Sequence, residues 1–180
     1  MRLTYRFRQF FFALAAKPSK EEIEIVNQTL SPELQKIFYQ LQSSDQKHSI
    51  EIFIKLKAQG EKDPDLLMAA LLHDVGKCLF PLRLWERVMI VLGQMLFPDI
   101  VNKWGRGNVD GWKRPFVIAR QHAQWGADLA KSAGASPLSV YLIRHHQDEL
   151  NTNRKEEKDI QENPQKEDLL FRLQRFDSES

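Results

Sequence analysis

Signals for the start of a helix recur along this chain of 180 residues, and they constrain its fold more than any other feature. Ser31-Pro32 and Asp63-Pro64 each place a capping residue before a proline, which is favoured at the first helical position. Ser19 precedes two glutamates that suit a first helical turn, and Pro137 opens another apolar segment. Almost every segment between these signals has helical spacing of apolar residues, so we expect an all-α fold.

Composition fits one globular domain. Hydrophobic residues make up 42% of the chain and charged residues 28%, which is enough for one sizeable core. The formal net charge of +2 is too small to indicate nucleic-acid binding, so we expect no specific nucleic-acid partner. The single cysteine, Cys78, excludes an intramolecular disulfide and suits a reducing compartment, so we expect a cytoplasmic protein.

The N-terminus has the outline of a signal peptide, with Arg2, Arg6 and Arg8 ahead of an apolar run over residues 10–16. That run is far shorter than the ~20 residues that cross a bilayer. We therefore expect residues 1–43 to form N-terminal helices that pack on a domain spanning 44–180. Peripheral membrane contact is an alternative that the sequence does not favour.

Two helices before residue 78 carry polar residues on otherwise apolar patterns. Ile50 and Phe53 follow His48 at helical spacing, and Gly60 ends that helix. A second helix starts at Asp63-Pro64 and ends at His73 and Asp74, with Gly76 as a plausible helix breaker. Adjacent helical residues point about 100° apart, so both side chains can reach one site only if the helix end lies against it.

All five histidines of the chain fall into one spaced pattern with acidic residues. His48 is followed by His73-Asp74, then by His122, then by the adjacent pair His145-His146. Gly126 follows His122 by one helical turn, and His145 and His146 lie on different faces of their helix, with Tyr141 and Leu142 respectively. Neutral imidazole and carboxylate are the ligands that proteins use for zinc, manganese, iron and similar ions.

The pattern resembles the HD superfamily of metal-dependent phosphohydrolases. The resemblance rests on Leu-Leu-His-Asp-Val-Gly-Lys at 71–77, on Asp-Gln-Lys-His at 45–48 and on the spacing His-x24-His-Asp-x2-Lys. It implies one or two divalent ions (Mn, Fe, Mg, Co or Zn). It also implies the following ligands: His48, His73, Asp74 and Asp177 for one metal, and His122 and His145 with a bridging Asp74 for a second.

Asp177 is the implied closing ligand, because the family's last aspartate usually follows a helix of the Leu-Leu-x-x-Leu-Gln type. Asp168 competes for this role, but an acid at a helix start is explained more simply as a cap. The almost wholly polar residues 151–167 are expected to be a mobile linker before that last helix.

An insert over residues 79–112 separates the two halves of the histidine pattern. Leu84, Val88 and Val91 continue as a helical apolar stripe bordered by basic and aromatic residues. We interpret this segment as a core helix with a solvated side, while an interfacial membrane helix is the alternative. The loop Gly105-Arg106-Gly107-Asn108 is either a lid over an anionic substrate or a plain connection.

The chemistry that the resemblance implies is hydrolysis of a small phosphorylated substrate, a mono- or diester related to nucleotides, by metal-activated water. Asp74 would anchor the metal, Lys77 would act on the phosphate, and His146 would donate a proton or contact the phosphate. The His-His pair is followed by Gln147-Asp148, not by the Gly-Tyr-Pro of the cyclic-di-GMP phosphodiesterase branch. Two alternatives remain: a di-iron oxygenase with the same ligands, and a non-catalytic regulatory protein that binds metal. The oligomeric state is not indicated.

Overall fold

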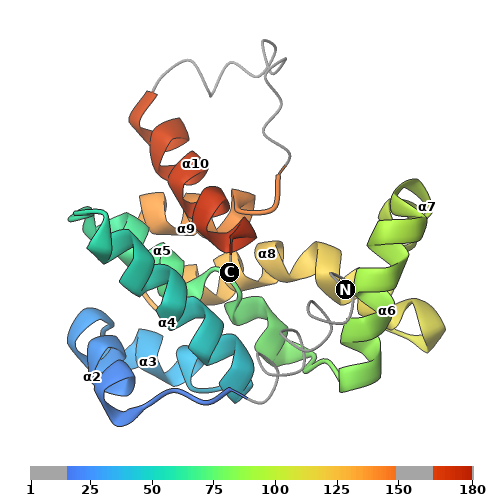
Figure 1. Cartoon of the computed structure of the whole chain (residues 1–180), viewed down its shortest axis with the longest axis horizontal. Coiled ribbons are helices and arrows are strands. Elements are labelled where there is room, and N and C mark those ends of the chain that lie inside the picture. The colour runs from blue at the N-terminus through green and yellow to red at the C-terminus, as the bar shows by residue number, and fades with distance from the viewer. Residues whose placement is uncertain (1–15, 149–163, 180) are drawn as a thin grey trace, which may run out of the picture.

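The computed structural model describes residues 16–148 and 164–179, and these residues form helices with no strand (Figure 1). The predicted all-α class is confirmed. None of the described helices is long and apolar enough to cross a membrane. The elements are α2 (Lys20–Thr29), α3 (Pro32–Phe38), α4 (Ser43–Ala58), α5 (Pro64–Leu72), the 3₁₀ helix η1 (Val75–Leu79), α6 (Leu84–Leu96), α7 (Pro98–Trp104), the 3₁₀ helix η2 (Gly111–Lys113), α8 (Arg114–Ser132), α9 (Pro137–His145) and α10 (Pro164–Ser178).

The expected helix starts are present where the capping residues lie. Ser19 forms a reciprocal capping box with Glu22, and Ser31 accepts a hydrogen bond from the backbone N–H of Leu34. Asp63 accepts from two backbone N–H groups in the first turn of α5. These local contacts set where each helix begins, and therefore which residues reach its C-terminal end.

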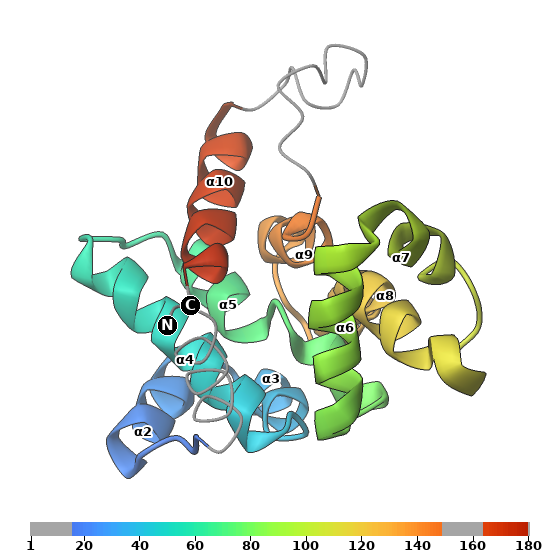
Figure 2. The same cartoon turned by 45° about the vertical axis from the view of Figure 1, so that its right-hand side comes forward.

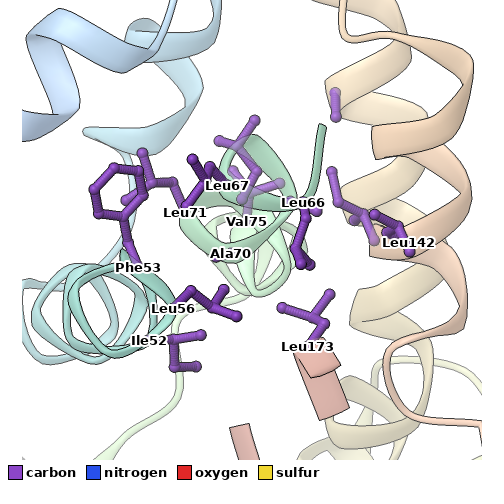
Figure 3. Close-up of a cluster of buried hydrophobic side chains, with 14 of the residues drawn as sticks. Ile52, Phe53, Leu56, Leu66, Leu67, Ala70, Leu71, Val75, Leu142 and Leu173 are labelled. Atoms are coloured by element: carbon purple, nitrogen blue, oxygen red, sulfur yellow. The ribbon is translucent and has the colours of Figure 1, made fainter. Parts of the chain in front are cut away.

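Helix α5 is the centre of the hydrophobic core. Its apolar side chains are buried on all sides, which is the pattern of a helix surrounded by others. Figure 3 shows Phe53 and Leu56 of α4, Leu142 of α9 and Leu173 of α10 converging on Leu66 and its neighbours. This packing fixes the C-terminal end of α5, where His73 and Asp74 lie, in the middle of the molecule.

The N-terminal helices α2 and α3 pack on the same core through Val26, Leu34 and Phe38. These contacts attach residues 20–38 to the core, whereas the basic and apolar N-terminal run falls almost wholly outside the described residues. Most of the predicted linker, residues 151–163, also lies outside them. Its last residues differ from the expectation, because α10 begins at Pro164 and already includes residues 164–167.

The insert over 79–112 forms α6, α7 and η2 on one side of the domain. Figure 2 shows α6 in front of α8, with α2 at the opposite side of the view. Gly93 of α6 packs against the ring of Phe116 in α8, so close that a Cβ atom there would lie 2.7 Å from it. One side of α6 therefore packs on α8, and Arg87 of α6 also forms an ion pair with Asp45 of α4.

Candidate metal centre

A first group of potential ligands joins α4 to the end of α5. His48, His73 and Asp74 each offer a nitrogen or oxygen atom within 4.8 Å of the others. Asp177 of α10 contacts the same group, with its Oδ1 at 2.9 Å from Nε2 of His48 and 3.5 Å from Nε2 of His73. His73 is fully buried, whereas the side chains of His48 and Asp177 are 28% exposed. This group therefore opens toward solvent on one side.

A second group shares Asp74 with the first and is buried throughout. It consists of Asp74, His122 of α8 and His146 at the end of α9. Nε2 of His122 lies 3.0 Å from Oδ1 of Asp74, and Nε2 of His146 lies 4.0 Å from the same oxygen. The other oxygen of Asp74, Oδ2, lies 3.5 Å from Nε2 of His73. One carboxylate thus faces both groups.

Backbone carbonyls hold the three buried imidazoles in one tautomer. Nδ1 of His73 lies 3.0 Å from the carbonyl of Ala70, Nδ1 of His122 lies 3.0 Å from that of Ile118, and Nδ1 of His146 lies 2.7 Å from that of Ile143. A carbonyl can only accept, so each Nδ1 donates and the Nε2 of a neutral ring keeps its lone pair. These three Nε2 atoms are buried and make no hydrogen bond within the described structure.

This donor set fits a metal ion. Buried polar atoms normally have partners, and three unpaired Nε2 atoms around one carboxylate are accounted for if a cation takes their lone pairs. A metal-bound histidine commonly donates its other ring N–H to a carbonyl, as all three do here. Within the described residues, the two groups that share Asp74 could therefore hold one or two divalent ions.

Asp74 lies at the junction between two kinds of helix. His73 caps the C-terminus of α5, and Asp74 has φ −93° and ψ 0° before η1 begins at Val75. Because the helix type changes here, the side chains of His73 and Asp74 point toward the same site. The sequence predicted this arrangement for a helix whose end lies against the site. Side chains three apart nearly eclipse in a 3₁₀ helix, and Nζ of Lys77 accordingly lies 2.5 Å from Oδ2 of Asp74.

Two glycines let η1 approach α8 closely enough to bring Asp74 to His122. A Cβ atom on Gly76 would lie 2.0 Å from the carbonyl oxygen of His122 and 2.6 Å from the backbone nitrogen of Gly126. Both are backbone atoms that cannot move aside. Gly76 was expected only to break a helix, but its main role is this contact between backbones. The missing side chain of Gly126, one turn after His122, completes the contact.

Charge in the site differs sharply between two of its imidazoles. Burial opposes protonation of His73, but Asp74 and Asp177 outweigh it and raise its pKa to about 9. Burial, followed by the neighbouring His73 and His122, lowers the pKa of His146 to about 3. Burial also opposes ionisation of Asp74, yet Lys77 and His73 hold its pKa well below the usual range. His146 is therefore neutral at physiological pH, and Asp74 is ionised.

The structure reverses the expected placement of the His145-His146 pair. His146 points to Asp74 and His122, whereas His145 lies at the surface side of α9, where its Nδ1 is 2.6 Å from Asp148 and its ring lies tilted against that of Tyr141, with ring centres 4.5 Å apart. The reason is the buried stripe of α9, in which Ser139, Leu142, Ile143 and His146 follow helical spacing. That spacing was present in the sequence. With a pKa of about 3, His146 also carries no proton on Nε2 at neutral pH that it could donate.

The two aspartates considered for the closing ligand lie in different surroundings. Asp177 faces His48 and His73, whereas Asp168 pairs with Arg172 at the exposed start of α10. Residues 45–48 hold one further element that sequence reasoning missed. Asp45 is buried and forms a two-pronged ion pair with Arg87 of α6, at 2.7 and 2.8 Å. The only signal for this pair was a carboxylate one turn before His48.

Arg87 and Lys77 line a cavity of about 240 Å³ that reaches His122. A second cavity of about 420 Å³ lies beyond it and includes His145, Arg120 and Arg144. Gln94, Ala119 and Gln147 border both cavities, so the two adjoin. The metal centre thus borders a space lined by Lys77 and Arg87 next to His122 and by Arg120 and Arg144 farther out.

Comparison with known proteins identifies the family. Searches of the curated proteins and of the solved structures found no match. The family model described as "HD domain" matches residues 46–175, from just before His48 to just before Asp177. The matched range covers most of the chain and includes the five histidines, Asp74 and Lys77. With this match and the paired histidine–aspartate groups at the end of α5, the chain belongs to the HD domain family.

Proposed function

We propose that this protein is a metal-dependent phosphohydrolase that cleaves a mono- or diester of a small, nucleotide-like phosphate. One observation carries the proposal: two ligand groups share Asp74, and the buried Nε2 atoms of His73, His122 and His146 make no hydrogen bond in the described structure. Such a site suits divalent cations, and many members of the family are phosphohydrolases of this kind.

Six side chains would hold the ions. His48, His73, Asp74 and Asp177 would serve one position, and Asp74, His122 and His146 the other; this assignment replaces His145 by His146. A bound divalent ion would supply a water of lowered pKa and would neutralise charge on phosphoryl oxygens. The protein's own contribution is to keep the imidazoles oriented through their Nδ1 hydrogen bonds and to keep Asp74 ionised.

Cations in the adjoining cavity favour an anionic substrate. Nζ of Lys77 lies beside Asp74, and burial, which opposes its charge, is outweighed by Asp74 so that its pKa is raised. Lys77 therefore stays charged at the point where a phosphate would enter next to His122. Arg87 is held at the cavity wall by Asp45, with its guanidinium fixed in one plane. The second cavity would take the part of the substrate beyond the phosphate.

Metal analysis followed by a phosphoester screen tests the proposal. Protein purified with and without oxygen would be assayed for bound metal, then for phosphate release with Mn, Mg, Fe, Co and Zn added back. We expect metal-dependent hydrolysis of at least one ester, and its loss in Asp74→Asn, because neither ligand group keeps its shared carboxylate. Wild-type turnover in Asp74→Asn would contradict the proposal.

Lys77→Ala separates substrate binding from metal binding. Removing the ammonium frees Oδ2 of Asp74, so metal content should stay at the parent level while kcat/KM falls by ~10²-fold. Lys57→Ala, at an exposed lysine of α4, is the matched control and should behave as the parent. Iron bound in both groups, oxygen consumption and no ester hydrolysis would instead favour the di-iron oxygenase.

A further inference from the structure

A large apolar surface on α6 and α7 stays exposed. Nine of the twelve large hydrophobic side chains that are exposed in the described structure lie between Leu79 and Trp112. Seven of them form what we call the α6–α7 ridge, with exposed fractions from 43% to 61%: Leu84, Trp85, Val91, Met95, Leu96, Phe97 and Ile100. Apolar exposure concentrated in this way marks an interaction surface.

Helix α6 has three sides, and two of them are already used. Gly93 and Glu86 face α8, where Gly93 meets Phe116 and Glu86 pairs with Arg114. Arg87, Ile90 and Gln94 face the cavity beside the metal centre. The third side carries the ridge, because Leu84, Val91 and Met95 recur at helical spacing with Trp85 and Leu96 beside them. The ridge is therefore neither core nor cavity wall, except at Val91, which borders both.

Basic residues outnumber acidic ones in the segment that carries the ridge. Arg83, Lys103, Arg106 and Lys113 are exposed there, against Asp99 and Asp110, and Nζ of Lys113 lies 5.6 Å from the ring centre of Trp112. Residues 79–114 contain six Lys or Arg and three Asp or Glu, a balance of +3. The whole chain carries only +2, so the other residues sum to −1. Positive charge and exposed apolar surface thus coincide in one part of the molecule.

We propose that the α6–α7 ridge docks on an anionic membrane surface. An amphipathic helix with Trp, Phe and Leu on one face and Lys or Arg at its borders inserts shallowly among lipid headgroups. The charge selects this occupant. A second copy would bring two basic segments together, and residues 1–15, with three arginines and no acidic residue, would also add like charge. Anionic lipid instead complements this positive charge.

Docking would also orient the cavity. Val91 belongs to the ridge and to the cavity that holds Lys77 and Arg87, so the cavity borders the docked surface along α6. A docked molecule would present this opening at the level of the lipid headgroups. The inference does not depend on the proposed hydrolysis, because membrane binding requires neither the metal nor turnover.

Vesicle flotation of the full chain tests the proposal, with a chelator present so that the metal centre plays no part. The probes are vesicles of phosphatidylcholine alone and of phosphatidylcholine with about 30% phosphatidylserine. We expect binding to the anionic vesicles and a fall in the partition constant of about tenfold or more in Met95→Glu/Leu96→Glu. The matched control is Ile54→Glu/Phe171→Glu, which adds equal charge at exposed apolar residues of α4 and α10 and should bind as the parent. Circular dichroism checks that both variants fold.

Equal vesicle binding by the parent and the folded ridge variant would overturn the proposal. Light scattering of the same proteins in solution measures their oligomeric state and so tests whether the ridge binds a second copy. A parent dimer that Met95→Glu/Leu96→Glu converts to a monomer would assign the ridge to a second copy instead. Loss of binding at high salt together with loss in the ridge variant is the combination expected for an anionic membrane surface.

Discussion

The two ligand groups that share Asp74 differ in how they are built. His122 lies on α8 and His146 directly after α9; both are almost fully buried, and the close contact of Gly76 with α8 brings His122 to Asp74. His48 and Asp177 are partly exposed, and Asp177 comes from the last helix, after residues 149–163. The buried group is therefore part of the core, whereas the other is completed by a separately connected helix. We expect changes to the first to affect folding and metal binding, and changes to the second to affect mainly metal affinity.

The largest effect is expected for Gly76→Ala. Its Cβ would meet two backbone atoms at 2.0 and 2.6 Å, so η1 and α8 must separate. We expect the free energy of unfolding to fall by ~3 kcal/mol or more, measured by urea denaturation. Gly107→Ala is the control, because its Cβ would have no neighbour nearer than 3.7 Å. Similar stability of the two variants would show that the buried group does not depend on this contact.

Substitution of the adjacent histidines sharpens the comparison within α9. His146→Ala should lower metal stoichiometry by about one ion per chain, because it removes one of three ligands of the buried group. His145→Ala should leave the stoichiometry unchanged, since its Nδ1 faces Asp148. Elemental analysis of the two variants checks this. If His145→Ala lowered the stoichiometry and His146→Ala did not, His145 would be the ligand, as the family resemblance implied.

Asp177→Asn tests the partly exposed group. Loss of the charged oxygen beside His48 and His73 should weaken metal binding at that position by about 10–100-fold, with little change at the buried group. Titration calorimetry would separate the two affinities. Asp168→Asn, in the same helix, should have no effect, because Asp168 pairs with Arg172 at the surface.

A change of one pH unit is expected to have the smallest effect, and it acts on metal binding. His73 has a pKa raised to about 9 by Asp74 and Asp177 in the metal-free site, against burial, and it must lose this proton to bind a metal. Affinity should therefore rise by up to about tenfold per pH unit from pH 7 to 9 and level off above that range. His146, with a pKa of about 3, should release no proton. Calorimetry in two buffers of different ionisation heat counts the protons; a flat profile between pH 7 and 9 would contradict this account.

Much of the fold followed from local chemistry. Capping residues and prolines marked where α2, α3 and α5 begin, and helical spacing of apolar residues indicated their buried faces. The insert was expected to be a core helix, but its apolar stripe is exposed along α6. The spacing of apolar residues cannot distinguish a buried helix face from an exposed one. An apolar stripe that packs on the core and one that remains on the surface have the same periodicity.

The sequence by itself determined the helical class, the histidine–aspartate ligand types and the family, because these depend on residue identity and short-range spacing. Only the tertiary structure decided which of His145 and His146 enters the site. It also showed that Gly76 lets η1 pack closely against α8, and that Asp45 holds Arg87, 42 residues away in the sequence. Each of these depends on how distant helices pack. A helix has a calculable face from its own sequence, but the neighbour that covers that face is chosen by the whole core.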